Sequence, residues 1–246
     1  MALTARPEDQ ALLLELQAFD TKLAQLDHRA KSLPELATLA GFAKDSEALR
    51  LTLAEQNGGL EDIALELKRI ESDVEVVETR ITRDTERAQA SSSVKDVTAL
   101  EQELASLRKR LGDLEEIELV VMERLEEQQK VADNTTAAAE ALAARTREVE
   151  QERDAALAAI AAERAVAAAG RDALAARIPA ELLALYEKQR SRYGTGASHL
   201  RGGVSMASGV KLLENEMQAI RAAAPDEVIM CASSEAILVR TAESGL

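Results

Sequence analysis

The chain has little of the material from which large globular cores are built. Its 246 residues include no tryptophan, two phenylalanines, two tyrosines and four prolines. Aromatic side chains supply much of the buried area in such cores. Charged residues make up 30% of the chain, which is typical of long helical proteins. The composition therefore favours elongated helical packing over one compact core.

The sequence also lacks signals for export or for membrane insertion. No apolar run approaches the roughly 18 residues that a membrane span needs, and residues 1–6 contain no apolar signal core. A single cysteine excludes an intramolecular disulfide and agrees with a reducing compartment. We expect a soluble, cytoplasmic protein with no membrane contact. The net charge of −14 disfavours a general nucleic-acid coat, so any such contact must be local.

Apolar residues recur along the middle of the chain at alternating steps of four and three. One such run extends from Leu49 to Ala88 and includes Asp84, and a second extends from Val97 to Leu125. This heptad spacing places the apolar residues on one face of each helix and predicts a coiled coil.

Three serines, Ser91, Ser92 and Ser93, separate the two runs. Serine is a poor helix former but a good cap, and Ser93 with Asp96 resembles a capping box that starts a second helix. Short connections favour antiparallel neighbours, so the two runs should form a hairpin. A turn centred near Ser91 and Ser92 places Ile63 beside Val120 and Ile81 beside Gln102.

The same register extends the hairpin toward the N-terminus. It places an N-terminal helix, residues 8–31, against residues 152–175. Ser32 and Pro34 interrupt this first arm, because proline suits the first turn of a new helix. The expected division is a hairpin over residues 1–178 with its tip near 89–95, a helix and linker over 179–196, and a separate domain over 197–246.

The last fifty residues change in composition and favour a small α+β domain. We expect a short strand at 210–212, a helix at 214–223, and a β-hairpin formed by strands at 227–231 and 236–240. Alternation along these two strands predicts an apolar cluster of Val228, Met230, Ile237 and Val239. The fold class is thus mainly α, a long coiled-coil hairpin with a small terminal domain.

Two turns of this domain have the spacing of a zinc ribbon without its ligands. Ser205 and Ser208 form one pair, Cys231 and Ser234 form the second, and only Cys231 can supply a thiolate. Structural zinc needs deprotonated thiolate or imidazole. We therefore expect a zinc-ribbon-like domain without metal and no other cofactor. His199 could join Cys231, but two ligands do not make a structural site, and Cys231 is also readily interpreted as a small buried apolar residue.

The order of these elements resembles the bacterial C4-type zinc-ribbon family DUF164 in its actinobacterial form. The most specific parts are the tip stretch, residues 93–104, and the tail from Ala224 to Leu246. The resemblance implies a non-enzymatic protein whose ribbon binds nucleic acid or protein. It places Ser205, Ser208, Cys231 and Ser234 at the four ligand points, where three depart from the pattern.

Two basic clusters are candidate docking surfaces, although solvated helix faces give the same pattern. The first lies at the predicted tip and comprises Arg80, Arg83, Arg87 and Lys95, next to Ser91, Ser92 and Ser93. The second leads into the terminal domain and comprises Lys188, Arg190, Arg192 and Arg201. The first suits an acidic protein, and the second is a candidate nucleic-acid contact. No aromatic residues are interleaved to stack bases, which disfavours single-strand recognition.

No catalytic motif stands out in the chain. We found no Ser/His/Asp set, phosphate-cradling glycine loop, HExxH motif or paired-carboxylate signature. We therefore predict a non-enzymatic coiled-coil adaptor that docks an unidentified protein partner through its tip and its ribbon-like head, with no small-molecule substrate. The alternative is a nucleic-acid-binding zinc-ribbon-type protein in transcription or RNA handling.

Overall fold

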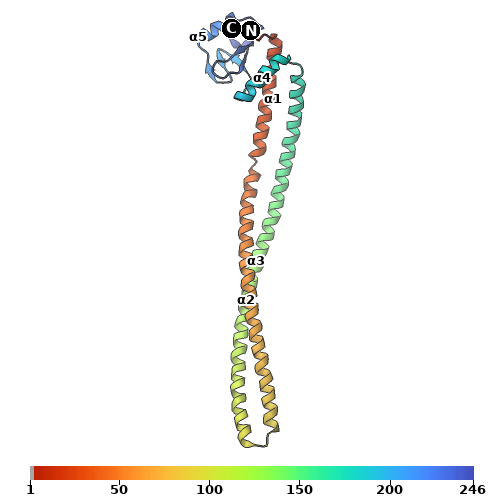
Figure 1. Ribbon diagram of the computed structural model, residues 1–246, viewed down its shortest axis with the longest axis vertical. Coiled ribbons are helices and arrows are strands. Elements are labelled where there is room, and N and C mark those ends of the chain that lie inside the picture. The colour runs from red at the N-terminus through yellow and green to blue at the C-terminus, as the bar shows by residue number, and fades with distance from the viewer. Residues whose placement is uncertain (1–2) are drawn as a thin grey trace. The chain divides into compact units, whose positions relative to one another are not determined.

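The computed structural model describes residues 3–246 and is mainly helical, with one small sheet in its C-terminal part (Figure 1). The chain divides into two compact units, one of Met1–Pro34 with Glu152–Leu246 and one of Glu35–Gln151. No helix within residues 3–246 is long and apolar enough to cross a membrane. The helices are α1 (Pro7–Lys31), α2 (Pro34–Ala90), α3 (Val94–Ala175), α4 (Ala180–Tyr193), α5 (Glu214–Ala222) and the short 3₁₀ helix η1 (Ala242–Ser244).

In the unit Glu35–Gln151, α2 and the first part of α3 run antiparallel and are joined by Ser91–Ser93 (Figure 1). The predicted coiled-coil hairpin is confirmed. The buried residues of α3 in this unit fall on the predicted seam or continue it, namely Leu104, Leu114, Val121 and Ala132. Across from them, the seam positions of α2 are half-buried, and Asp84 is buried. The seam accounts for the pairing of the two helices because it is the face that each helix removes from water.

The predicted register agrees with the ion pair of Arg80 and Glu103 near the tip but not with that of Arg124 and Glu66 farther along the hairpin. Val120 is 57% exposed, whereas the adjacent Val121 is 2% exposed. Gln102 is also exposed, and Leu104 takes the buried position. One residue along a helix rotates the side chain by about 100°, so a small error in the centre of the turn moves a predicted partner off the seam.

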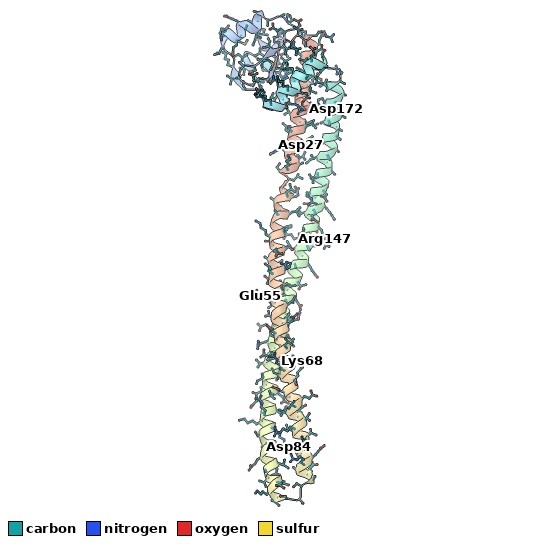
Figure 2. The ribbon with its side chains drawn as sticks, in the orientation of Figure 1. Asp27, Glu55, Lys68, Asp84, Arg147 and Asp172 are labelled. Atoms are coloured by element: carbon teal, nitrogen blue, oxygen red, sulfur yellow. The ribbon has the colours of Figure 1, made fainter. Side chains whose placement is uncertain are left out.

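In the other unit, α1 packs beside the C-terminal part of α3, as predicted. Asp27 of α1 (labelled in Figure 2) accepts a 2.8 Å hydrogen bond from Arg164 of α3, and Asp20 accepts one of 2.7 Å from Arg171. The predicted division of the chain at residues 178 and 196 stays a prediction.

The small sheet has five strands in the order β3-β2-β1-β5-β4. They are β1 (Ala197–Arg201), β2 (Val204–Ser205), β3 (Val210–Lys211), β4 (Ile229–Met230) and β5 (Ile237–Val239). The predicted hairpin of the last two strands is confirmed, since β4 and β5 pair antiparallel. Strand β1, which pairs parallel with β5, was missed because its sequence has none of the β-branched residues that mark strands.

The sheet separates two small cores, because successive residues of a strand point to opposite faces. Ile237 and Val239 of β5 pack with Leu13, Leu16, Leu174, Ile178, Leu182, Tyr186, Ala197 and Val228. Leu238 points the other way and packs with Leu200, Leu212, Met217, Ile220 and Cys231. The predicted cluster of Val228, Met230, Ile237 and Val239 is confirmed within the first core, where Met230 is partly buried.

An N-terminal segment extends the sheet region in a way that the sequence did not indicate. Thr4 bridges Glu227 in antiparallel fashion, and the Ala5 N–H donates to the Asp226 carbonyl at 2.7 Å. The Gln10 side chain of α1 donates to the same carbonyl at 3.3 Å. Residues on either side of the start of α1 are therefore joined to the strand region.

Candidate functional site

The hairpin tip is formed by the end of α2, the turn Ser91–Ser93 and the start of α3. The Ser93 hydroxyl accepts from the Asp96 N–H at 3.4 Å, and the Ser91 hydroxyl accepts from the Ser93 N–H at 3.2 Å. Ser93 thus caps α3 as expected for this residue type, while Ser92 is exposed. The turn is short and internally bonded, so it presents both helix ends in a defined arrangement.

The arginines at the tip are not equivalent. Asp84, near the tip in Figure 2, is 4% exposed and lies 3.2 Å from Arg87 and 3.8 Å from Arg80. Arg80 also pairs with Glu103 of α3. These two arginines are therefore partly neutralised. The exposed side chains of Arg83 and Lys95 have no hydrogen bond or ion pair to any residue of 3–246.

Two hollows flank these side chains. One of 410 Å³ is lined by residues of α2 that include Arg80, Arg83 and Arg87, with Glu103 across from them. A second hollow of 490 Å³ is lined by Arg87, Ser91 and residues at the start of α3. Val94 stands beside the turn with 82% of its surface exposed. The tip thus combines concave surface, unpaired cations and an exposed apolar side chain.

The second basic cluster is largely engaged inside the molecule. Arg190 lies 2.8 Å from Glu187 and 3.4 Å from Asp20, and Arg201 donates to Glu243 at 2.8 Å. The Arg192 guanidinium lies 5.3 Å from the ring centroid of Tyr193. Lys188 alone has no such side-chain partner among residues 3–246. The four cations therefore do not form a free basic surface.

Arg190 belongs to a polar network that sequence reasoning missed. Asp20 of α1 accepts from the Tyr186 hydroxyl of α4 at 2.6 Å and from Arg171 of α3 at 2.7 Å. Burial and the bond to Asp20 raise the pKa of Tyr186 above its ordinary value. The bond to Asp20 likewise raises the pKa of Arg171. The network joins three helices. Its charged members Asp20 and Arg171 lie 151 residues apart in the sequence, so no local pattern indicates that they meet.

The four zinc-ribbon positions lie in two turns of similar backbone geometry. In the first turn, the Gly209 N–H donates to the Ser205 carbonyl at 2.8 Å, and in the second the Glu235 N–H donates to the Cys231 carbonyl at 2.8 Å. Gly209 has φ +68° and Glu235 has φ +58°, so the same place in each turn adopts the left-handed conformation. Glu235 accepts this conformation although it is not glycine, which indicates that the turn is imposed by its surroundings.

Serine and cysteine side chains meet between the two turns. Sγ of Cys231 lies 3.3 Å from Oγ of Ser205 and 3.2 Å from Oγ of Ser233, and Ser233 donates to Ser208 at 3.1 Å. Cys231 and Ser205 are both fully buried. The Ser234 hydroxyl oxygen is buried without a hydrogen-bond partner within residues 3–246. We call these five residues the serine–cysteine cluster.

The donor set of this cluster does not fit zinc. One thiol and three hydroxyls occupy the four ligand points, and hydroxyl groups stay protonated and bind zinc weakly. No group of three or more His, Cys, Asp or Glu side chains within residues 3–246 could hold a metal ion. His199 and His28 are both exposed.

The Cys231 thiol is nevertheless perturbed. Burial raises its pKa, but hydrogen bonds from the neighbouring serines, Ser205 and Ser233 foremost, and from the Ser233 backbone have the larger combined effect, so the pKa of Cys231 falls to about 6. Because the side chain is fully buried, the thiolate is held by its neighbours and is closed to large reagents.

Comparison with known proteins places the hairpin in a defined family. The model of the CT398-like coiled coil hairpin domain matches residues 16–194. The protein Rv2229c of Mycobacterium tuberculosis is 35% identical over 232 residues, which cover 94% of this chain and 95% of the relative. A solved structure from Mycobacterium smegmatis is 35% identical with a TM-score of 0.88, covering 97% of this chain and 100% of that chain. CT398 from Chlamydia trachomatis has a TM-score of 0.67 at 17% identity, with 94% and 97% covered, and so shares the fold.

Proposed function

Because the chain belongs to the family of the CT398-like coiled coil hairpin domain, we propose that it is a non-enzymatic adaptor that docks a partner protein at its hairpin tip. The observation that carries this proposal is the position of Val94. An apolar side chain that is 82% exposed gains nothing from folding and is available as an anchor in a partner's pocket.

The charges around Val94 suit a partner surface that carries carboxylates. Lys95 is its neighbour in the sequence, and Arg83 lines the hollow beside the turn. Neither cation has an internal partner within residues 3–246, so neither must break an existing bond to bind. Rim charges of this kind guide association and set specificity more than they add affinity.

We also propose that the small sheet domain is a ribbon in which hydrogen bonds have replaced a metal. The support is the matching geometry of its two turns and the serine–cysteine cluster between them. A hydrogen bond contributes about 1 kcal/mol, far less than a structural zinc ion. The two apolar cores on the faces of the sheet would then carry most of the stability.

The nucleic-acid alternative has less support. It relies on Lys188, Arg190, Arg192 and Arg201, of which Arg190 and Arg201 are ion-paired. Phosphate binding requires several free cations on one surface. A protein partner at the tip requires only Arg83, Lys95 and the apolar anchor.

Charge reversal tests the tip. Purified wild-type protein, the double variant Arg83→Glu with Lys95→Glu, and the control Lys44→Glu would be used to capture partners from a lysate of the source cells. We expect the double variant to lose the captured partner, while Lys44→Glu and Cys231→Ser retain it. Circular dichroism checks that helicity is unchanged. Loss of capture in Cys231→Ser with an unaffected tip variant would move the active surface to the sheet domain.

A further inference from the structure

We infer that a groove between α1 and the rim of the small sheet binds a peptide segment that carries a carboxylate beside apolar side chains. The groove has a volume of 680 Å³, within the range of roughly 300–1,000 Å³ that ligand sites occupy. Its α1 wall includes Leu14, Ala18 and Lys22, and its sheet wall includes Ser198, His199 and Met206. All of these residues belong to one compact unit.

The α1 wall borders the first core, because Leu14 is partly buried against that core whereas Ala18 and Lys22 are exposed. Leu13 and Leu16 are fully buried in the first core, with 0% exposure, and Asp20 is bound in the polar network. Leu14, Ala18 and Lys22 follow one another at steps of four and lie on a different side of the same helix. Helix α1 therefore packs against the first core with one face and lines the groove with the adjoining face, and Leu14 is shared by both.

The charge of the groove differs from that of the chain. The protein carries 44 acidic and 30 basic residues, yet no residue that lines the groove is Asp or Glu. Its ionisable side chains are Lys22 and His199, and neither has a side-chain hydrogen bond or ion pair to any residue of 3–246. A carboxylate beside an ammonium group is attracted to it in water, and more strongly where water is excluded.

The other lining residues favour a peptide over a simple anion. Leu14, Ala18 and Met206 offer apolar surface, and Met206 is 54% exposed. Methionine adapts its shape to different side chains, which is why it is frequent at peptide-binding surfaces. Thr21, Gln25 and Thr195 add hydroxyl and amide groups that can bond to a peptide backbone.

Nucleic acid fits the groove less well than a peptide. One lysine and one histidine neutralise few phosphates. The lining also contains no aromatic side chain on which a base could stack. The observations therefore favour a protein segment as the occupant, and they do so independently of the proposal for the hairpin tip.

A direct binding measurement tests this inference. The full-length protein would be titrated against a fluorescent peptide of alternating leucine and glutamate, with the matching leucine–lysine peptide as a probe of charge selectivity. We expect saturable binding of the glutamate peptide only. The double variant Lys22→Glu with His199→Glu should bind about tenfold or more weakly, while the control Lys31→Glu, on the same helix and outside the groove, should bind like wild type.

Four outcomes would overturn the inference. Equal binding of both peptides, or binding that Lys22→Glu with His199→Glu leaves unchanged, would show that the groove does not select carboxylates. Tighter binding of duplex DNA that displaces the peptide would assign the surface to nucleic acid. Sedimentation showing that wild type self-associates and the groove variant does not would assign it to a second copy of the chain. Because Arg83→Glu with Lys95→Glu leaves the groove intact, normal peptide binding by that variant separates this inference from the tip proposal.

Discussion

The hydroxyl of Tyr186 donates a 2.6 Å hydrogen bond to Oδ2 of Asp20, and this contact joins α4 to α1 across 166 positions of sequence. Gly196, which follows α4, donates its N–H to Gln17 at 2.8 Å, and a side chain at this glycine would come within 2.5 Å of the Tyr186 ring. The start of β1 is therefore positioned from α1 and α4 together.

Removing Asp20 should destabilise this unit more than removing the tyrosine hydroxyl. Asp20→Ala removes the buried carboxylate, leaves the half-buried Arg171 without its main partner and should cost about 3–5 kcal/mol. Tyr186→Phe removes the hydroxyl that donates to Asp20 and lies 3.2 Å from Gln17, and it should cost about 1–2 kcal/mol. Urea denaturation of both variants measures the difference. Equal, small losses would contradict a structural role for the network.

The loss of stability on replacing a leucine of the hairpin with alanine should depend on how deeply that leucine is buried. Leu114 is 3% exposed and Leu119 is 62% exposed, although both are leucines of α3. Leu114→Ala should cost about 2–4 kcal/mol, whereas Leu119→Ala should change the free energy of unfolding by about 0.5 kcal/mol or less. Thermal denaturation followed by circular dichroism compares the two. Similar losses would mean that the register of α3 is wrong.

The seam shows how much of the fold the sequence predicts. Heptad spacing identified the face that each helix turns toward the other, including the buried Asp84 and the half-buried seam positions of α2, because periodicity reports which face is apolar. It did not identify the partner of each position, since that depends on the exact centre of the turn at Ser91–Ser93. The predicted partners Gln102 and Val120 are both exposed for this reason.

The sites were less predictable than the fold. Spacing places Ser205 with Ser208 in one tight turn and Cys231 in another, and the contact of Cys231 with Ser205 joins the two turns. The pair of Arg190 with Glu187 has a local spacing that the sequence could indicate, but the pairs of Arg190 with Asp20 and of Arg201 with Glu243 arise only through tertiary packing. Arg240 is a further example, because its guanidinium donates to four backbone carbonyls between Ala223 and Glu227, and a lone arginine just after a strand gives no sign of this.

The perturbed thiol predicts a pH dependence of stability. The pKa of Cys231 is lowered to about 6 in the folded protein, whereas an exposed thiol in the unfolded chain titrates near about 8.5. Between these values the unfolded state binds more protons, so the free energy of unfolding should rise with pH. This stabilisation should be complete above the unfolded pKa and lost as pH falls through 6.

Denaturation at several pH values tests this expectation against Cys231→Ser. The variant lacks the titrating thiol, so its free energy of unfolding should not show the rise with pH between the two pKa values. An identical pH profile for both proteins would show that the thiol stays protonated throughout this range.

Restoring the missing ligands should create a metal site. The two turns already share one backbone geometry, so the triple variant Ser205→Cys, Ser208→Cys and Ser234→Cys would supply four thiolates with Cys231. We expect this variant to bind one zinc ion tightly and to unfold at a higher temperature when loaded. Elemental analysis and a chelator titration measure both. A variant that folds but binds no zinc would contradict the ribbon proposal.

The most direct test of tip docking is site-specific photo-crosslinking in cells. A photoreactive amino acid would replace Val94, which is 82% exposed at the tip, or Val166, which is 72% exposed on α3 in the other compact unit. The adaptor account predicts a discrete protein adduct from position 94, absent from position 166 and lost when Arg83→Glu and Lys95→Glu are added. The same adducts from both positions, or none from position 94, would contradict it.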